Sequence, residues 1–297
     1  RTMGNENGKK TANENTPKTS HRKNAHLNLA RRDDAIAAVS TALDQVRLIH
    51  NALPELNINE IDLSCHFLGR RLAMPMMIGA MTGGTDRADA LNLTLAKAAN
   101  QAGVALAVGS QRASLEDGRS QLALRDAAPD IPIIGNLGGV QLAQPSGIDL
   151  AMRAVESLGA DALAIHLNPL QELTQPEGDR DWRGVEAAIE TATKTLPCPI
   201  IVKEVGAGIS ASVAGRLKAA GASWVDVAGL GGTNWTRIET MRRGDDGDVM
   251  APFLDWGNPT LDAILAIKHE NSDLRLIASG GIRHGLDAAK AIWLGAD

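Results

Sequence analysis

From residue 72 onward, this chain of 297 residues alternates short, almost wholly apolar runs with segments of helical pattern. Strands that alternate with helices are typical of βαβ units, which build a parallel sheet. Because the runs lack polar alternation, we expect strands that are buried on both faces by covering helices. The predicted strands are Leu72–Ala80, Val104–Gly109, Ile131–Leu137, Ala162–Leu167, Pro199–Val205, Trp224–Gly229 and Leu274–Ser279.

Helices are expected between these strands, and several carry signals at their ends. Pro145 and Ser146 precede one helix, while Ser210 is a candidate N-cap and Gly221 a terminating residue for another. The predicted helices are Arg87–Gln101, Gly147–Leu158, Ser210–Ala220, Thr260–Glu270 and Leu286–Leu294.

An internal repeat suggests how the sheet continues. The letters LGAD at Leu158–Asp161 precede the strand Ala162–Leu167, and the similar AGAS at Ala220–Ser223 precedes the next but one. The same LGAD recurs at Leu294–Asp297, so an eighth strand is expected directly afterwards. Eight βα units close a barrel. The sequence therefore predicts an α/β fold, a (β/α)8 TIM barrel over residues 72–297 whose eighth unit is missing from this chain.

Charge separates the N-terminal region from the body. Residues 1–32 carry eight Lys or Arg and two Glu, whereas the remainder carries 22 basic and 33 acidic residues. A basic segment on an acidic body suits a nucleic acid or a phosphorylated ligand. Residues 1–18 have the composition of a disordered tail. We interpret residues 19–71 as an N-terminal arm or lid that leads into the barrel.

Composition excludes several classes of protein. With 44% hydrophobic and 22% charged residues, the chain reads as an ordinary globular protein. No apolar run reaches the roughly 18 residues of a membrane span. The first residues lack an apolar region, so a secretory signal is not expected. Only two cysteines occur, without the ligand spacing of a zinc site, which suits the cytoplasm. Because aromatic residues make up 2%, platforms for nucleic-acid bases are scarce, and no nucleic-acid partner is expected.

Polar residues gather where the predicted strands end, and these ends form the active-site face of such a barrel. Lys203 is the most informative, because a lysine inside the apolar run PIIVKEV must be paired or functional. Two glycine-rich turns, Gly231–Thr233 and Ser279–Gly281, offer backbone N–H groups to an anion such as phosphate. The other predicted strands end in segments that carry polar residues, namely Met81-Thr82, Ser110-Gln111-Arg112, Asn136 and His166-Leu167-Asn168.

One segment of the sequence also matches the dinucleotide-binding fingerprint. Residues 206–211 fit the pattern G-x-G-x-x-A, and Asp226 follows twenty residues later. However, Lys203 lies in the preceding strand, Asp226 falls inside its own strand, and the unit is fifth in a series of like units. These features favour a barrel over a dinucleotide-binding domain.

The chain resembles type 2 isopentenyl-diphosphate δ-isomerase, a flavoprotein of the FMN-dependent barrel group. The resemblance extends from about Arg22 to Asp297. The stretches RKNAH at 22–26 and HLNPLQE at 166–172 are the most specific to that family. Further matching stretches are MPMMIGAMTGG at 74–84, VGSQRASLED at 108–117, GNLGG at 135–139, PIIVKEVGAGIS at 199–210, DVAGLGGTNW at 226–235, DWGNPT at 255–260 and ASGGIR at 278–283.

The resemblance implies a set of site residues. Gln171 and His166 are expected to take part in catalysis, with Gln171 beside the reacting alkene, and Glu172 to bind Mg²⁺. The substrate would be bound by Arg22, Lys23, His26, Arg112, Asn168 and Gln171, and its diphosphate would be held by Arg22, Lys23, Arg112, His166 and Asn168. FMN would contact Met81, Thr82, Ser110, Asn136, Lys203, Thr233, Gly280, Gly281 and Arg283.

The resemblance further implies that isopentenyl diphosphate is converted to dimethylallyl diphosphate. Reduced FMN would act as acid and base, and NADPH would serve only to reduce the flavin. Members of the family commonly form tetramers or octamers, so a homo-oligomer is expected.

Three other functions are alternatives to the isomerase. An FMN-dependent α-hydroxy-acid oxidase or dehydrogenase needs a histidine base after the sixth strand, where Ala228–Gly232 contains none. A dehydrogenase of the inosinate type needs a nucleophilic cysteine after the phosphate turn, and residues 278–297 contain none. A non-enzymatic phosphate-binding barrel is the third alternative.

Overall fold

The computed structural model describes residues 18–297, apart from the side chains of residues 18–20 and 245–248. Its main sheet has seven parallel strands, each paired with the next one along the chain. The strands are β3 (Met77–Ile78), β4 (Ala105–Ala107), β5 (Ile133–Gly138), β6 (Ala162–His166), β7 (Ile200–Lys203), β8 (Trp224–Asp226) and β9 (Leu276–Ile277). Sequential parallel order with helical crossovers is the topology of a curled, barrel-like α/β sheet.

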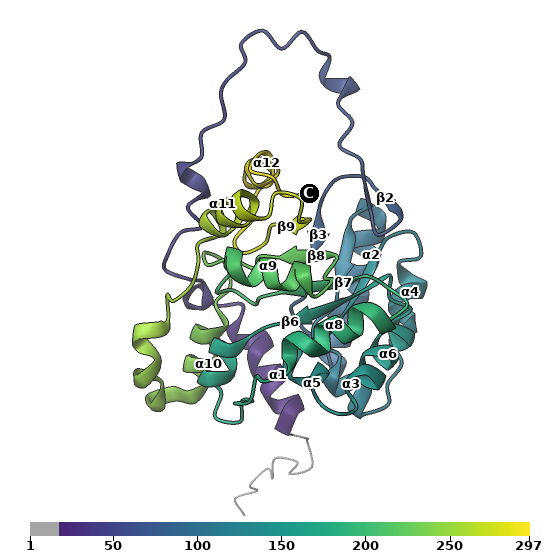
Figure 1. Cartoon of the computed structure of the whole chain (residues 1–297), viewed down its shortest axis with the longest axis vertical. Helices are drawn as coiled ribbons and strands as arrows, with labels where there is room; N and C mark the ends of the chain where they lie inside the picture. Colours follow the sequence, from purple (N-terminus) through teal and green to yellow (C-terminus); the bar gives the residue numbers. More distant parts are fainter. Residues whose placement is uncertain (1–17) are drawn as a thin grey trace, which may run out of the picture.

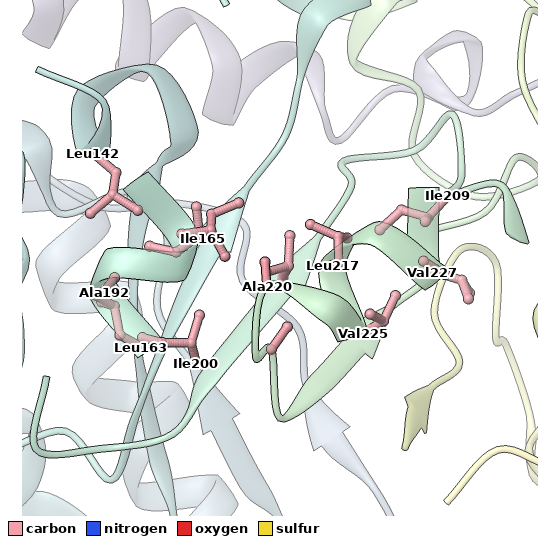
Figure 2. Packing of buried hydrophobic residues seen from close by; sticks show 14 of the residues in the cluster. Leu142, Leu163, Ile165, Ala192, Ile200, Ile209, Leu217, Ala220, Val225 and Val227 are labelled. Atoms are coloured by element: carbon pink, nitrogen blue, oxygen red, sulfur yellow. The ribbon is translucent and has the colours of Figure 1, made fainter. Parts of the chain in front are cut away.

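Helices cover the outside of this sheet (Figure 1). The longer ones are α2 (Asp86–Ala102), α6 (Gly147–Leu158), α8 (Val185–Thr195), α9 (Ala211–Ala219), α10 (Trp235–Arg243), α11 (Thr260–Glu270) and α12 (Gly285–Trp293). The shorter ones are α3 (Arg112–Glu116), α4 (Leu122–Ala127), α5 (Gly139–Leu142) and α7 (Pro169–Thr174), and the 3-10 segment η4 (Gly244–Phe253) follows α10. Figure 2 shows the apolar layer between strands and helices, where Leu163 and Ile165 of β6 are buried in one cluster with Ala192 and Leu217 of the helices.

The inner face of the sheet is filled by small residues and closed by a hairpin. Alanines of β4 and β6 pack with Phe67 and Leu72, which come from the antiparallel strands β1 (Cys65–Phe67) and β2 (Arg70–Leu72). The hairpin turn has positive φ at both Leu68 and Gly69, as a tight two-residue turn requires. Phe67 meets Trp224 of β8 edge to face, with ring centroids 5.0 Å apart. The hairpin therefore packs against the inner face of the sheet, where Phe67, Leu72 and Trp224 also line a cavity.

The predicted fold class is confirmed. Five of the later predicted strands contain an observed one, and Ile131–Leu137 covers all of β5 except its last residue, Gly138. The prediction for the first strand, Leu72–Ala80, is wrong in its extent, because Leu72 belongs to the hairpin and β3 covers only Met77–Ile78. Pro75 lies between them and has no N–H to offer to a ladder. The predicted helices agree within about one residue at each end, while α4, α8 and α10 were not predicted.

The repeated LGAD letters correspond to a repeated structure. The backbone N–H of Asp161 donates to Ile133 O at 2.9 Å, and its carboxylate accepts the N–H of Ile133 at 2.8 Å. Asp297 makes the same two bonds to Leu276, also at 2.9 and 2.8 Å. Asp297 thus holds the first residue of β9 as Asp161 holds that of β5. The strand expected after Asp297 stays a prediction.

The N-terminal region begins with α1 (Lys18–Leu29), which lies beside α10 (Figure 1). Three short 3-10 segments follow, η1 (Asp33–Ala35), η2 (Leu43–Gln45) and η3 (Ile58–Glu60), and the last lies on a long excursion away from the body. The tail predicted for residues 1–18 lies outside the described residues except for Lys18, and the division of the chain at residue 71 stays a prediction. Among the described residues, no helix is both long and apolar enough to span a membrane.

Candidate active site

The polar residues at the ends of β3 to β7 line one cavity of about 490 Å³. A second cavity of about 750 Å³ shares Met81, Lys203 and Trp235 with it, so the two adjoin. Residues Thr233, Gly280 and Gly281 line the second cavity. The predicted residues that line the first are Arg22, Lys23, His26, Met81, Thr82, Ser110, Arg112, Asn136, His166, Asn168, Gln171, Glu172 and Lys203.

His166 ends β6 and faces a fixed partner. Its Nδ1 lies 2.8 Å from Oδ1 of Asn136 on the neighbouring strand, and the Asn136 amide donates to Val108 O at 3.1 Å. Burial, with the nearby charges of Lys203 and Lys23, lowers the pKa of His166 to about 3. The ring is therefore neutral, with its proton on Nδ1 and Nε2 left as an acceptor.

Three predicted residues share one face at the start of α7. Asn168 donates its amide to Gln171 Oε1 and to Glu172 Oε1, both at 3.0 Å. This contact follows from the spacing, since residues three and four apart are neighbours on a helix surface. Pro169 at the first helical position fixes where the helix begins. The three side chains are thus held together before any ligand binds.

Glu239 is a member of this network that the sequence did not reveal. It is fully buried on α10, and its Oε1 accepts from Gln171 at 3.3 Å and lies 2.8 Å from His26 Nε2. Burial alone would raise the pKa of Glu239, but His26 and Arg242 bring it below its usual value. The carboxylate therefore stays charged and joins α1, α7 and α10.

Trp235 is a second residue that the sequence analysis does not predict, and it lines both cavities. Its ring meets His26 edge to face at 5.2 Å. Asn234, the N-cap of α10, could have predicted a helix with Trp235 and Glu239 four residues apart on one face. Nothing in the sequence indicates that this face points to the site.

Helix α1 brings positive charge to the cavity. Arg22 donates to Gln175 Oε1 at 3.0 Å, and Lys23 donates to Ser110 O at 3.0 Å. Burial and the charge of Arg22 lower the pKa of Lys23 to about 8. Arg112 lies at the rim and pairs with Glu116 at 2.8 Å. These cations suit an anionic ligand.

Lys203 points from β7 into both cavities and is only 9% exposed. Its amine donates to the main-chain oxygen of Glu204. The Glu204 carboxylate is used elsewhere, because its Oε2 accepts the four N–H groups of residues 205–208 at 2.5 to 3.2 Å. Burial raises the pKa of Glu204, and these amides oppose that rise. The amides of the apparent dinucleotide fingerprint are therefore already bound, as the barrel interpretation requires.

The two glycine-rich turns lie against each other. A Cβ on Gly232 would come within 2.5 Å of Gly281 N, and Gly280 has a φ of +98°. Arg283 donates to Gly231 O at 2.8 Å, which ties the second turn to the first. Only glycine fits such an approach, and the backbone it exposes can bind phosphate.

The residues present fit both a flavin phosphate and a single magnesium ion. The glycine turns form a cradle beside the buried amine of Lys203. Among the described residues, no group of three His, Cys, Asp or Glu side chains could hold a metal alone. Glu172 lines the cavity with Asp179, however, and Mg²⁺ usually takes one or two carboxylates together with phosphates of the substrate.

A family model of FMN-dependent dehydrogenases matches residues 20–130 and 138–297, and the chain belongs to this family. Solved structures agree in fold. A mandelate oxidase variant with an FMN adduct aligns with a TM-score of 0.56 at 19% identity, over 86% of this chain and 73% of that one. A lactate oxidase from Pediococcus acidilactici aligns with a TM-score of 0.60 at 17% identity, over 86% of this chain and 69% of that one.

Relatives with higher sequence identity assign the chain to a more specific family. The chain is 51% identical over 282 residues to isopentenyl-diphosphate delta-isomerase of Stutzerimonas stutzeri. The alignment covers 93% of this chain and 82% of that protein. The chain is 45% identical over 288 residues to the protein of the same name from Aeropyrum pernix, covering 95% and 77%. The chain therefore belongs to the isopentenyl-diphosphate delta-isomerase family, and the resemblance seen in its motifs is confirmed.

Proposed function

We propose that this chain converts isopentenyl diphosphate to dimethylallyl diphosphate with reduced FMN and Mg²⁺. One observation carries the proposal: Gln171 is held between Asn168 and the buried Glu239 in a cavity that cations of α1 line on one side and Lys203 on another. A neutral amide held at both ends suits a site that orients an alkene beside a flavin.

FMN would lie along the strand ends, with its ring near Lys203 and its phosphate at the two glycine turns. The buried ammonium of Lys203 would stabilise negative charge on the reduced ring. Reduced FMN supplies the acid and base that a carbon–carbon double-bond shift needs, and NADPH would keep it reduced. The other expected contacts are Met81, Thr82, Ser110, Asn136, Thr233, Gly280, Gly281 and Arg283.

The substrate diphosphate would bind between α1 and α7. Arg22, Lys23 and Arg112 supply cations for its oxygens, and Asn168 donates hydrogen bonds. Neutral His166 accepts at Nε2, so it suits an orienting contact and not the binding of charge. Glu172 would hold Mg²⁺, which bridges to the diphosphate. His26, fixed by Glu239, would close α1 over the bound substrate.

An FMN-dependent α-hydroxy-acid oxidase or dehydrogenase on the same fold is the alternative. That chemistry needs a histidine base that accepts a proton near neutral pH. The segment that follows β8, Val227–Gly232, contains no histidine. The pKa of His166, lowered to about 3, makes it a poor base. The isomerase is therefore the function that the site supports best.

An anaerobic assay tests the proposal. The protein is mixed with FMN, NADPH, Mg²⁺ and isopentenyl diphosphate, and dimethylallyl diphosphate is measured. We expect product that depends on all four additions, and loss of product when a chelator removes Mg²⁺. Oxidation of lactate or mandelate in air, without any isomerisation, would favour the alternative.

A further inference from the structure

A strap formed by residues 35–43 crosses the glycine turn that follows β8. The N–H of Ala37 donates to Gly232 O at 2.9 Å, and the N–H of Asn234 donates to Ala35 O at 2.8 Å. Ile36 and Thr233 form an antiparallel bridge between these bonds. The strap therefore pairs with the turn as a short extra strand, and η1 connects it to helix α1.

Thr41 fills the space between the two glycine turns. It is 5% exposed, and its Cγ2 methyl would lie 2.6 Å from a Cβ built on Gly231 and 2.5 Å from one built on Gly281. Since neither glycine has a side chain, the Thr41 methyl occupies the room between the turns. The Thr41 backbone is equally close to Gly231, with N at 2.5 Å and Cα at 2.7 Å from the built Cβ, so the methyl is the part of Thr41 that meets both turns.

The position of this methyl is fixed by the surrounding contacts. The N–H of Leu261 donates to Thr41 O at 3.0 Å, and Thr41 Oγ1 accepts the N–H of Leu43 at 3.2 Å. The next residues are anchored as well, because Leu43 is fully buried and its carbonyl accepts from Lys290 Nζ at 2.8 Å. Helices α11 and α12 therefore hold the strap in place.

We infer that Thr41 is a positioning residue for the phosphate of FMN: its methyl holds the turns at Gly229–Thr233 and Ser279–Arg283 at the separation at which their N–H groups can bind phosphate. This inference rests on the FMN placement in the proposed function. Several N–H groups must point at one anion together, so a shift of one turn weakens the whole contact. Riboflavin has the same ring but no phosphate, and its binding is independent of this separation.

Two substitutions separate the methyl from the hydroxyl. Thr41→Ser keeps the acceptor for Leu43 and removes the methyl, whereas Thr41→Val keeps the shape and removes the acceptor. Flavin affinity is measured with the full chain by the change in flavin fluorescence, without any prenyl diphosphate. Thr41→Ser should raise the Kd for FMN about tenfold, as expected for roughly one lost methyl contact plus a misplaced turn. Its Kd for riboflavin, and both Kd values of Thr41→Val, should stay within about twofold of wild type.

Three results would overturn the inference. If Thr41→Ser leaves FMN affinity unchanged, the methyl does not position the turns. Thr41→Val that loses as much affinity for FMN as Thr41→Ser assigns the role to the hydroxyl. Equal losses for FMN and riboflavin indicate a general structural effect.

Thermal unfolding of each variant is the control for folding. Ser40→Ala, which removes an exposed neighbouring hydroxyl bonded to Asp44 at 2.9 Å, is the matched variant and should leave FMN affinity unchanged. Should Thr41→Ser not fold, the Thr41→Val result decides alone, because a loss specific to FMN contradicts the steric role. The titration contains no substrate, so a failure of the isomerase proposal leaves its outcome unaffected.

Discussion

The two halves of the site are built in different ways. Around α7 and α10, buried side chains hold one another, as Gln171 holds Asn168 and Glu239. After β8 and β9, backbone meets backbone at glycines, with the Thr41 methyl between the turns. A substitution in the first half removes a chemical group, whereas one in the second half only displaces N–H groups that remain present. The first half should therefore govern chemistry and the second the binding of the cofactor phosphate.

Gln171→Leu tests the half of the site around α7 and α10, where side chains hold one another. It removes the amide between Asn168 and Glu239 and keeps a similar volume. Because a positioned polar group in proton transfer contributes about 10²–10⁴-fold, we expect kcat to fall about 10³-fold with FMN affinity unchanged. Gln144→Leu, at an amide outside the two cavities that donates to Val140 O at 3.3 Å, is the control. A normal kcat for Gln171→Leu would remove this residue from the chemistry.

Gly281→Ala tests the backbone half. A Cβ there would lie 2.5 Å from Gly231 O, at a φ of +77° that disfavours side chains. A cost of about 3 kcal/mol at the turn corresponds to an increase in the FMN Kd of about 100-fold. Riboflavin binding should change far less. Gly285→Ala is the matched control, since no atom lies within 4 Å of a Cβ at that position. Equal effects of the two substitutions would contradict the comparison.

Lys203 joins the halves, because it lines both cavities. Lys203→Ala removes a buried charge-assisted contact of about 2 kcal/mol, which predicts an FMN Kd about 30-fold higher. Since Lys203 is proposed to act on the ring, riboflavin should weaken equally, in contrast to Gly281→Ala. Lys203→Met keeps the apolar stem and should weaken both flavins as well. Unchanged flavin affinity would mean that the lysine is not beside the ring.

The pH dependence of substrate use tests the cations of α1. Burial lowers the pKa of Lys23 from 10.5 to about 8, so the free protein loses this charge as the pH rises through about 8. The cationic form binds the diphosphate, and therefore kcat/KM should fall by up to about tenfold between about pH 7 and pH 9. Lys23→Arg should flatten this fall, because arginine keeps its proton. A profile that is the same for both proteins assigns the fall to another group.

Much of the fold was predictable from the sequence because parallel strands leave a simple signal. The continuous apolar run 162–167 contains β6, and the run 131–137 covers β5 except for Gly138; both strands are fully or almost fully buried. The first predicted strand was wrong in extent because Leu72, Met74 and Met77 are all apolar. In the structure they belong to different elements: Leu72 to the hairpin, Met74 to the bend that follows, and Met77 to β3. Short amphipathic helices such as α4 were missed because six residues carry too little periodic pattern.

The candidate site was predictable where its residues stand at strand ends, since topology alone gathers these ends. Asn136, His166 and Lys203 meet in the cavity for that reason. Glu239 and Thr41 could not be predicted in the same way. Each comes from a segment whose place is decided by tertiary packing, α10 against α1 for the first and the strap against two turns for the second. Sequence spacing does not report such distant contacts.

The proposed reaction of this site moves a double bond without net oxidation. The most direct test is an anaerobic incubation of the protein with reduced FMN, Mg²⁺ and isopentenyl diphosphate in deuterated water. We predict dimethylallyl diphosphate that carries deuterium in the methyl group derived from C4, with the flavin still reduced at the end. Absence of this product, or product without solvent deuterium, would contradict the account.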